Sequence, residues 1–268
     1  MSNKNNNIKK WPYTVVRAIL FCLSCAATLA TVSAVVKGLP NAWSQHLLLI
    51  IASAITFGIT VLFVRWEKLK LSDVGVVPGR FTFKRLAIGF LIGMILAFLQ
   101  SAFVLLCGHF KFIYSSVITF IDILLYLSLY ILVAVREELA FRGFPLRSLN
   151  YSIGPWKAQL IIVTIFSLEH VAGGMTWRDA FLGAGTGAVL FGLAALKTKG
   201  LALPIGLHIA WNFGQWCMGF KKEAGLLQGI SDKGYENIVE RNAWVGYLLV
   251  MGIAIVFFYF YKPKRYST

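Results

Sequence analysis

Charged residues are scarce in this chain of 268 residues. Only 14% of the residues are charged, whereas 58% are hydrophobic, and the mean hydropathy is +0.71. Soluble domains carry roughly 25% charged residues, so this chain has too little polar surface for a water-soluble fold. Because a bilayer is the natural solvent for such a composition, the sequence predicts an integral membrane protein.

Acidic residues are scarcer than basic ones, with 11 Asp and Glu against 26 Lys and Arg and a net charge of +15. Nucleic-acid binding would require a basic footprint on one face of a domain. Here the basic residues lie in the gaps between long apolar runs, which favours contacts with anionic lipid head groups and cytoplasmic retention of loops. We therefore expect membrane lipids as partners and no nucleic acid.

Cysteine is also scarce, and all four cysteines fall in apolar segments. Cys22 and Cys25 have the C-x-x-C spacing of some redox and zinc sites. They lie in the first apolar run, with no βαβ pattern and no second pair, so two small buried residues on one helix is the preferred interpretation. We expect no disulfide framework.

Several catalytic and binding motifs are absent from the sequence. The chain has no H-E-x-x-H, no G-x-S-x-G, no P-loop and no complete zinc finger. These absences exclude assignments that rest on those patterns alone. Any active site must therefore be found among the polar residues of the apolar segments.

Eight apolar segments approach the roughly 20 residues that a helix needs to cross a bilayer. No internal repeat or low-complexity stretch separates them, so we predict a single transmembrane domain, residues 1–268, built as an all-α polytopic helix bundle. The first segment is longer than the apolar stretch of a cleaved signal peptide, so an uncleaved span is the preferred interpretation, although Val32-Ser33-Ala34 resembles a weak cleavage site. The fifth is short, and we expect it either to extend toward Pro155 or not to cross fully. The predicted spans are 14–36, 45–64, 86–106, 116–135, 158–172, 178–196, 201–219 and 243–261.

The distribution of Lys and Arg predicts that both chain ends are cytoplasmic. With the N-terminus inside, cytoplasmic segments hold 19 of the 26 basic residues and outer segments hold 7, as the positive-inside rule requires. The longest polar connection, 221–242, is then a loop outside the membrane. The Asn- and Lys-rich start and the compact size favour a bacterial cell membrane.

Polar residues in or beside the spans are informative, because a charge at bilayer depth costs roughly 2.5–3.5 kcal/mol. The first cluster, at the cytoplasmic end of the fourth span, contains Glu137, Glu138 and Arg142. Glu138 and Arg142 are four residues apart and can pair on one helix face. Glu137 is rotated from Glu138 by about 100° and faces a different neighbour. This arrangement is one way to make a general base, and an ordinary charged helix end is the alternative.

Two further clusters contain histidine. His170 ends the fifth apolar run, one turn after Phe166, and by itself fits a lone histidine near a membrane interface. Glu169 and His170 do not complete the H-x-x-E-H zinc pattern, because Phe166 stands where that pattern needs histidine. In the seventh span, His208 and Asn212 project from one helical face. They predict either hydrogen bonding between helices or a functional site.

Together, the three clusters resemble the signature of the CPBP family, also called the Abi or type II CAAX prenyl endopeptidase family. That signature reads E-E-x-x-x-R, F-x-x-x-H and H-x-x-x-N on separate membrane helices, and this chain matches each motif in order and spacing. The resemblance covers about residues 85–215, which would form the catalytic core. It implies an intramembrane, glutamate-dependent metalloendopeptidase acting on a membrane-associated or lipidated peptide. Bacterial members are associated with maturation of peptide pheromones or bacteriocins, or with self-immunity.

The resemblance also implies a role for each motif residue. By this resemblance, Glu137 activates the attacking water, Glu138 orients the site and Arg142 anchors it. His170 holds the water. His208 and Asn212 stabilise the oxyanion. If Zn²⁺ or another divalent metal is bound, its ligands are Glu137, His170 and His208. Sequence alone leaves the version with metal and the version without it open.

Two other functions also stay open, a non-catalytic peptide-binding immunity protein and a small proton-coupled transporter. For an enzyme, the three motifs must converge on one cavity, which we expect to open to the cytoplasm. An outward-running fifth span places His170 near the far end. That span must therefore be re-entrant, or it must start deeper in the membrane than the predicted span 158–172 implies.

Overall fold

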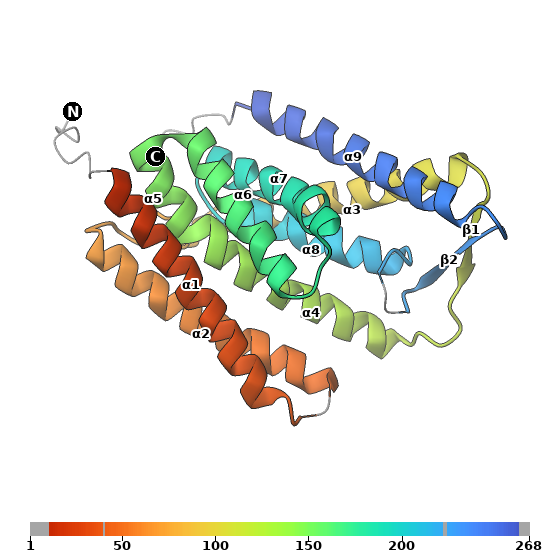
Figure 1. The fold of residues 1–268 in the computed structure, drawn as a ribbon, viewed down its shortest axis with the longest axis horizontal. Helices are drawn as coiled ribbons and strands as arrows, with labels where there is room; N and C mark the ends of the chain where they lie inside the picture. The colour runs from red at the N-terminus through yellow and green to blue at the C-terminus, as the bar shows by residue number, and fades with distance from the viewer. Residues whose placement is uncertain (1–10, 40, 222–223, 263–268) are drawn as a thin grey trace. The chain divides into compact units, whose positions relative to one another are not determined.

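In the computed structural model the described part of the chain is predominantly helical, which confirms the predicted all-α fold (Figure 1). The structure describes residues 11–39, 41–221 and 224–262. Six of the basic residues counted for the predicted orientation lie outside the described residues, namely Lys4, Lys9, Lys10, Lys222, Lys264 and Arg265.

The elements follow the predicted order of spans, with two short strands added. They are α1 (Trp11–Val36), α2 (Asn41–Trp66), α3 (Thr82–Leu106), β1 (Phe110–Tyr114), α4 (Phe120–Glu138), the π-helical turn η1 (Leu139–Gly143), α5 (Phe144–Ile153), α6 (Pro155–Ala172), the π-helical turn η2 (Asp179–Ala184), α7 (Gly185–Thr198), α8 (Ala202–Cys217), β2 (Leu227–Ser231) and α9 (Glu236–Phe260).

The chain folds into two compact units. Unit 1 comprises Met1–Gly79 and Val135–Leu201, and unit 2 comprises Arg80–Ala134 and Ala202–Thr268. Helix α4 contributes to both units, since the boundary falls before its last turn. The prediction of a single domain stays a prediction.

Five of the described helical segments are long and apolar enough to cross a membrane. They are α1, residues 43–66 of α2, α3, the run of η2 and α7, and α9, and they correspond to the first, second, third, sixth and eighth predicted spans. The other three predicted spans are α4, α6 and α8, with 19, 18 and 16 residues. These three shorter helices carry all the motif residues except Arg142, which follows α4 in η1.

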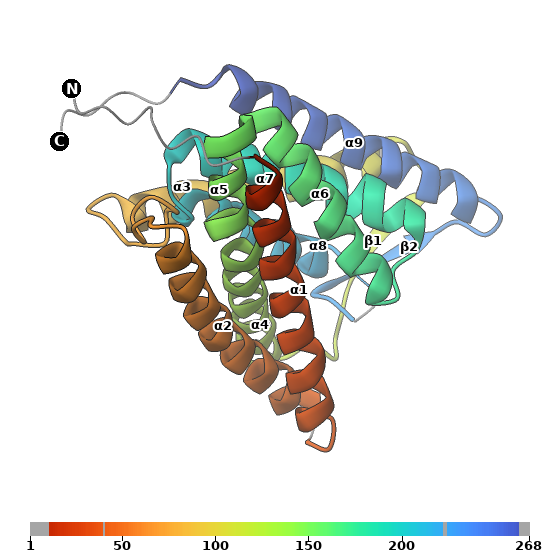
Figure 2. The ribbon, with the colours of Figure 1, turned by 60° about the vertical axis from the view of Figure 1, so that its left-hand side comes forward.

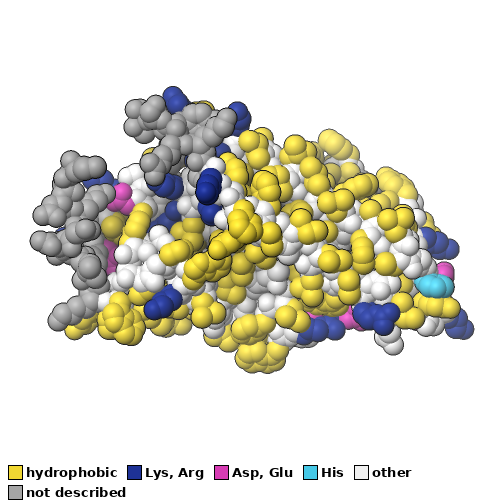
Figure 3. Space-filling model, turned by 90° about the horizontal axis from the view of Figure 1, so that it is seen from above, with side chains coloured by type: hydrophobic (Ala, Val, Ile, Leu, Met, Phe, Trp, Pro, Cys, Tyr) yellow, Lys and Arg dark blue, Asp and Glu magenta, His cyan; other side chains and the backbone are white. Residues whose placement is uncertain are grey.

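Apolar side chains cover much of the face seen in Figure 3. On α9, Ile253, Val256, Phe257 and Phe260 are each more than half exposed. Soluble proteins rarely expose contiguous apolar surface on this scale. The surface therefore fits lipid contact and agrees with an integral membrane protein.

The core of unit 1 joins α1, α2 and α5. Helices α1 and α2 lie side by side in Figures 1 and 2. The ring of Phe21 on α1 lies 5.3 Å from Phe63 on α2 and 5.1 Å from Phe144 on α5, measured between centroids. Such aromatic packing adds to the stabilisation from area burial.

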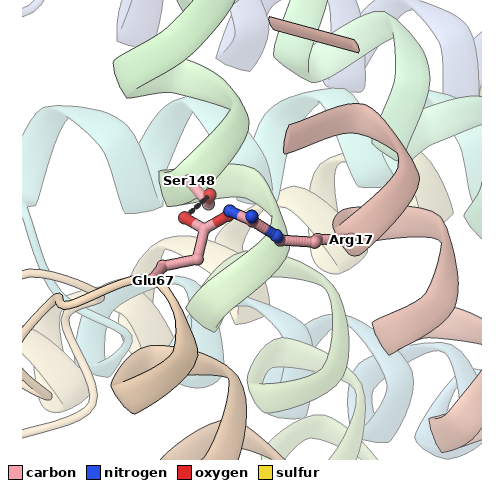
Figure 4. Close-up of polar contacts among 3 residues, drawn as sticks. All are labelled: Arg17, Glu67 and Ser148. Atoms are coloured by element: carbon pink, nitrogen blue, oxygen red, sulfur yellow. Dashed lines mark hydrogen bonds and ion pairs between the residues drawn. The ribbon is translucent and has the colours of Figure 1, made fainter. Parts of the chain in front are cut away.

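A buried polar contact reinforces the same three helices (Figure 4). Glu67, directly after α2, is 3% exposed and accepts a hydrogen bond from the Ser148 hydroxyl of α5. Its Oε1 lies 3.4 Å from Nη1 of Arg17 on α1. A buried carboxylate needs such partners to offset the loss of hydration.

In unit 2, α3 and α8 pack so closely that glycine is required at their contact. An added Cβ at Gly89 of α3 would collide with the Leu203 carbonyl oxygen, and one at Gly206 of α8 would collide with that of Leu86. Small residues let helix backbones approach in this way. Because Gly206 lies two residues before His208, this contact sets the position of the third motif within unit 2.

The connections of unit 2 differ from the predicted loops. Strands β1 and β2 pair antiparallel, with Phe110 opposite Ser231 and Tyr114 opposite Leu227. The predicted connection over 221–242 contains β2 and the first residues of α9, and its location outside the membrane stays a prediction. Hydrogen bonds between the two strands satisfy backbone groups that a loop would leave to solvent.

Candidate active site

The first motif lies where α4 changes from α-helical to π-helical geometry. Helix α4 ends at Glu138, η1 contains Arg142, and α5 continues to Ile153. The predicted connection between the fourth and fifth spans, residues 136–157, is thus largely helical. Single π-helical turns occur frequently at functional sites.

Helix α6 turns back immediately after α5. Gly154, with φ +83°, forms the turn, and Pro155 starts the new helix at a position where proline costs no backbone hydrogen bond. The short fifth span therefore does extend to Pro155, as expected. Because α6 begins only after the ten residues of α5, its later turns return to the level of the first motif.

Glu138 and Arg142 form the predicted ion pair. Their Oε1 and Nη1 atoms are 3.3 Å apart, and both side chains are 0% exposed. Desolvation makes each charge costly alone, so each residue stabilises the ionised form of the other. The pair therefore holds the junction of α4 and η1 in place.

Arg142 also links the first motif to the second. Its guanidinium lies 4.5 Å from the centroid of the Phe166 ring, a cation–π contact. The Phe166 ring lies 4.3 Å from the His170 ring. Two of the three motifs thus meet within unit 1.

The orientation of His170 follows from one hydrogen bond. Its Nδ1 lies 2.9 Å from the Phe166 carbonyl oxygen. A carbonyl only accepts, so Nδ1 carries the proton, and Nε2 of the neutral imidazole keeps its lone pair. Nε2 is therefore the atom that can accept a hydrogen bond from water or bind a metal.

The two adjacent carboxylates differ in exposure. Glu138 is fully buried, whereas Glu137 is half-buried and has an interaction partner of its own. A fully buried carboxylate in an ion pair cannot reach a water molecule. Of the two, Glu137 is the carboxylate that is not fully buried.

Sequence reasoning missed an ion pair between the two motif helices. Nη1 of Arg136 lies 2.5 Å from Oε1 of Glu169. The two residues directly precede Glu137 and His170 in the sequence. Their pairing could not be read from sequence, since it depends on α6 folding back along α4.

The third motif lies in unit 2. His208 is 5% exposed, and Asn212 is half-buried. Lys221, which we predicted in the outer loop, donates a hydrogen bond to Oδ1 of Asn212 over 3.0 Å. Lysine only donates, so it engages the amide oxygen and leaves the Asn212 NH₂ group to donate elsewhere. The sequence held no signal for this contact.

The predicted convergence of all three motifs involves both units and stays a prediction. The same holds for the metal set Glu137, His170 and His208. Among residues 11–39, 41–221 and 224–262, no group of three or more His, Cys, Asp or Glu side chains is placed to hold a metal ion. Neither unit by itself therefore brings together a complete metal site among its described residues.

Comparison with known families supports the motif assignment. Residues 119–214 match the model of the type II CAAX prenyl endopeptidase Rce1-like family. This segment is about a third of the chain and contains all three motifs, so the resemblance to the CPBP family is confirmed. No curated protein matches the chain.

Proposed function

We propose that this protein, CAAX-protease-like over residues 119–214, is an intramembrane endopeptidase that uses Glu137 as general base. The observation that carries the proposal is the contrast between two neighbouring carboxylates. Glu138 is fully buried and paired with Arg142, whereas Glu137 is half-buried. In this proposal the buried, paired carboxylate orients the site, and the less buried Glu137 carries out the proton transfer.

In the first step, Glu137 takes a proton from a water molecule, whose oxygen attacks the peptide carbonyl carbon. His170 holds this water by accepting its other hydrogen at Nε2, the nitrogen left by the bond from Nδ1 to Phe166. A positioned base of this kind supplies about 10²–10⁴-fold in rate.

In the second step, negative charge develops on the carbonyl oxygen. Asn212 donates from its NH₂ group, since Lys221 holds its oxygen, and His208 supplies the second donor. Each oxyanion donor is worth roughly 10²–10³-fold in a site that excludes water. The carbon–nitrogen bond then breaks, and Glu137 returns its proton to the leaving amine.

The substrate in this proposal is a peptide or lipidated peptide at the cytoplasmic face of a bacterial membrane. Both chain ends then lie in the cytoplasm, in agreement with the distribution of basic residues. Peptide maturation and self-immunity both fit such a substrate.

The test is peptide hydrolysis by purified protein in liposomes, with a panel of synthetic lipidated and unlipidated membrane peptides read by mass spectrometry. Wild type and the control Glu240→Gln, at an exposed position, should yield fragments. Glu137→Gln and His208→Ala should yield none. Peptide binding without hydrolysis would instead indicate an immunity protein. Flux that depends on a proton gradient would indicate a transporter.

A further inference from the structure

We infer that the ion pair of Arg136 and Glu169 is a positioning device that sets Glu137 against His170. This inference rests on the proposed function. Neither residue belongs to the three motifs, yet each directly precedes a motif residue on a different helix. The pair therefore ties the helix of the candidate base to the helix of the candidate water-holding histidine.

The geometry is that of a tight, desolvated pair. Nη1 of Arg136 and Oε1 of Glu169 are 2.5 Å apart, and the side chains are 3% and 17% exposed. Neighbouring residues on a helix differ in direction by about 100°. Arg136 and Glu169 thus point away from the directions of Glu137 and His170, and they hold the two helices without occupying the site.

Glu169 is the main anchor of the Arg136 guanidinium. Within the described part of the chain, Nε and Nη2 of Arg136 are buried and have no hydrogen-bond partner. Cys22 and Cys25 of α1 lie close enough to interact electrostatically with both residues of the pair. A buried charge depends strongly on its one partner, so this pair fixes the spacing of α4 and α6.

Misplacement of a catalytic group by 1 Å can cost about 10²-fold in rate. Breaking the pair should therefore lower kcat even in protein that remains folded. A pair with a purely structural role would lower only the folded fraction. The contact of Arg17 with Glu67 is the matched case, since it is also a buried ion pair of unit 1 but touches no motif residue.

The experiment compares Glu169→Gln with Glu67→Gln in liposomes, using a peptide that the wild type cleaves. For Glu169→Gln we expect kcat to fall about 10- to 100-fold, with KM within about twofold. Glu67→Gln should unfold more readily but keep kcat per folded molecule. Arg136→Lys, which keeps the charge, should retain more activity than Arg136→Met.

The double variant Arg136→Glu with Glu169→Arg tests the pairing directly. The kcat of the double variant should be at least tenfold higher than the kcat of either single reversal. The inference is overturned if Glu169→Gln keeps full kcat while Glu137→Gln is inactive, or if Arg136→Lys and Arg136→Met are equally impaired. If Glu137→Gln is fully active, the proposed function itself fails.

Discussion

Lys221 donates a hydrogen bond to the side-chain oxygen of Asn212 across 3.0 Å. Lys221 also lies 5.9 Å from the centroid of the Tyr130 ring, a second contact that restrains its ammonium group. Asn212 lies in α8, whereas Lys221 lies nine residues further along the chain, beyond the end of this helix. The chain therefore folds back toward α8 to make this contact. Asn212 is therefore oriented by a residue outside its own motif.

Replacing Lys221 should impair catalysis more than binding. Lys221→Met removes the donor that holds Oδ1, so the amide can rotate and lose its aim at the oxyanion. We expect kcat to fall roughly tenfold or more, within the range for loss of one oxyanion donor. Lys233→Met, at an exposed position close by, is the matched control. Equal activities of the two variants in single-turnover cleavage would contradict this role.

Replacing Glu138 should act on stability. Glu138→Gln leaves the Arg142 guanidinium charged in a fully buried position. Removing one partner of a buried ion pair costs about 3–5 kcal/mol. Unfolding in liposomes or mixed micelles should show this loss, and Glu240→Gln should not. A Glu138→Gln protein as stable as wild type would show that the pair does not support the fold.

The contact of α3 with α8 predicts a sharp difference between two glycines. Gly206→Ala places a methyl group against the Leu86 carbonyl oxygen and should push α8 away from α3. Gly252→Ala on α9 meets nothing within 4 Å and should be neutral or slightly stabilising, because alanine favours helix over glycine. Thermal unfolding of the two variants checks this. Similar melting temperatures would argue against the close packing.

The predicted orientation can be tested with a native cysteine. Cys107, directly after α3, is exposed, whereas Cys22 and Cys25 are buried. With the N-terminus inside, Cys107 lies on the outer side of the membrane. A membrane-impermeant maleimide should label it in intact cells, and Cys107→Ser should lose this signal. Labelling of Cys107 only after permeabilisation would reverse the orientation.

Sequence predicted the apolar helices well because lipid imposes a simple rule of length and composition. The spacing of Glu138 and Arg142 also predicted their ion pair, since residues four apart share a helix face. These features depend on local periodicity alone. They need no knowledge of how helices pack.

Other features depend on packing and could not be predicted. The helix α5 (Phe144–Ile153) between the fourth and fifth spans was not predicted, because its sequence contains a proline and an arginine. The contacts of Arg136 with Glu169 and of Lys221 with Asn212 join residues from different segments. Strands β1 and β2 are short and lie more than 100 residues apart in the chain, so neither alone carries a recognisable pattern.

Hydrolysis in water labelled with ¹⁸O tests the central claim most directly. Wild-type protein in liposomes, incubated with a cleavable membrane peptide, should place one ¹⁸O in the new carboxyl terminus, and Glu137→Gln should form no such product. Labelled product from Glu137→Gln at the wild-type rate would contradict the role of Glu137 as the base.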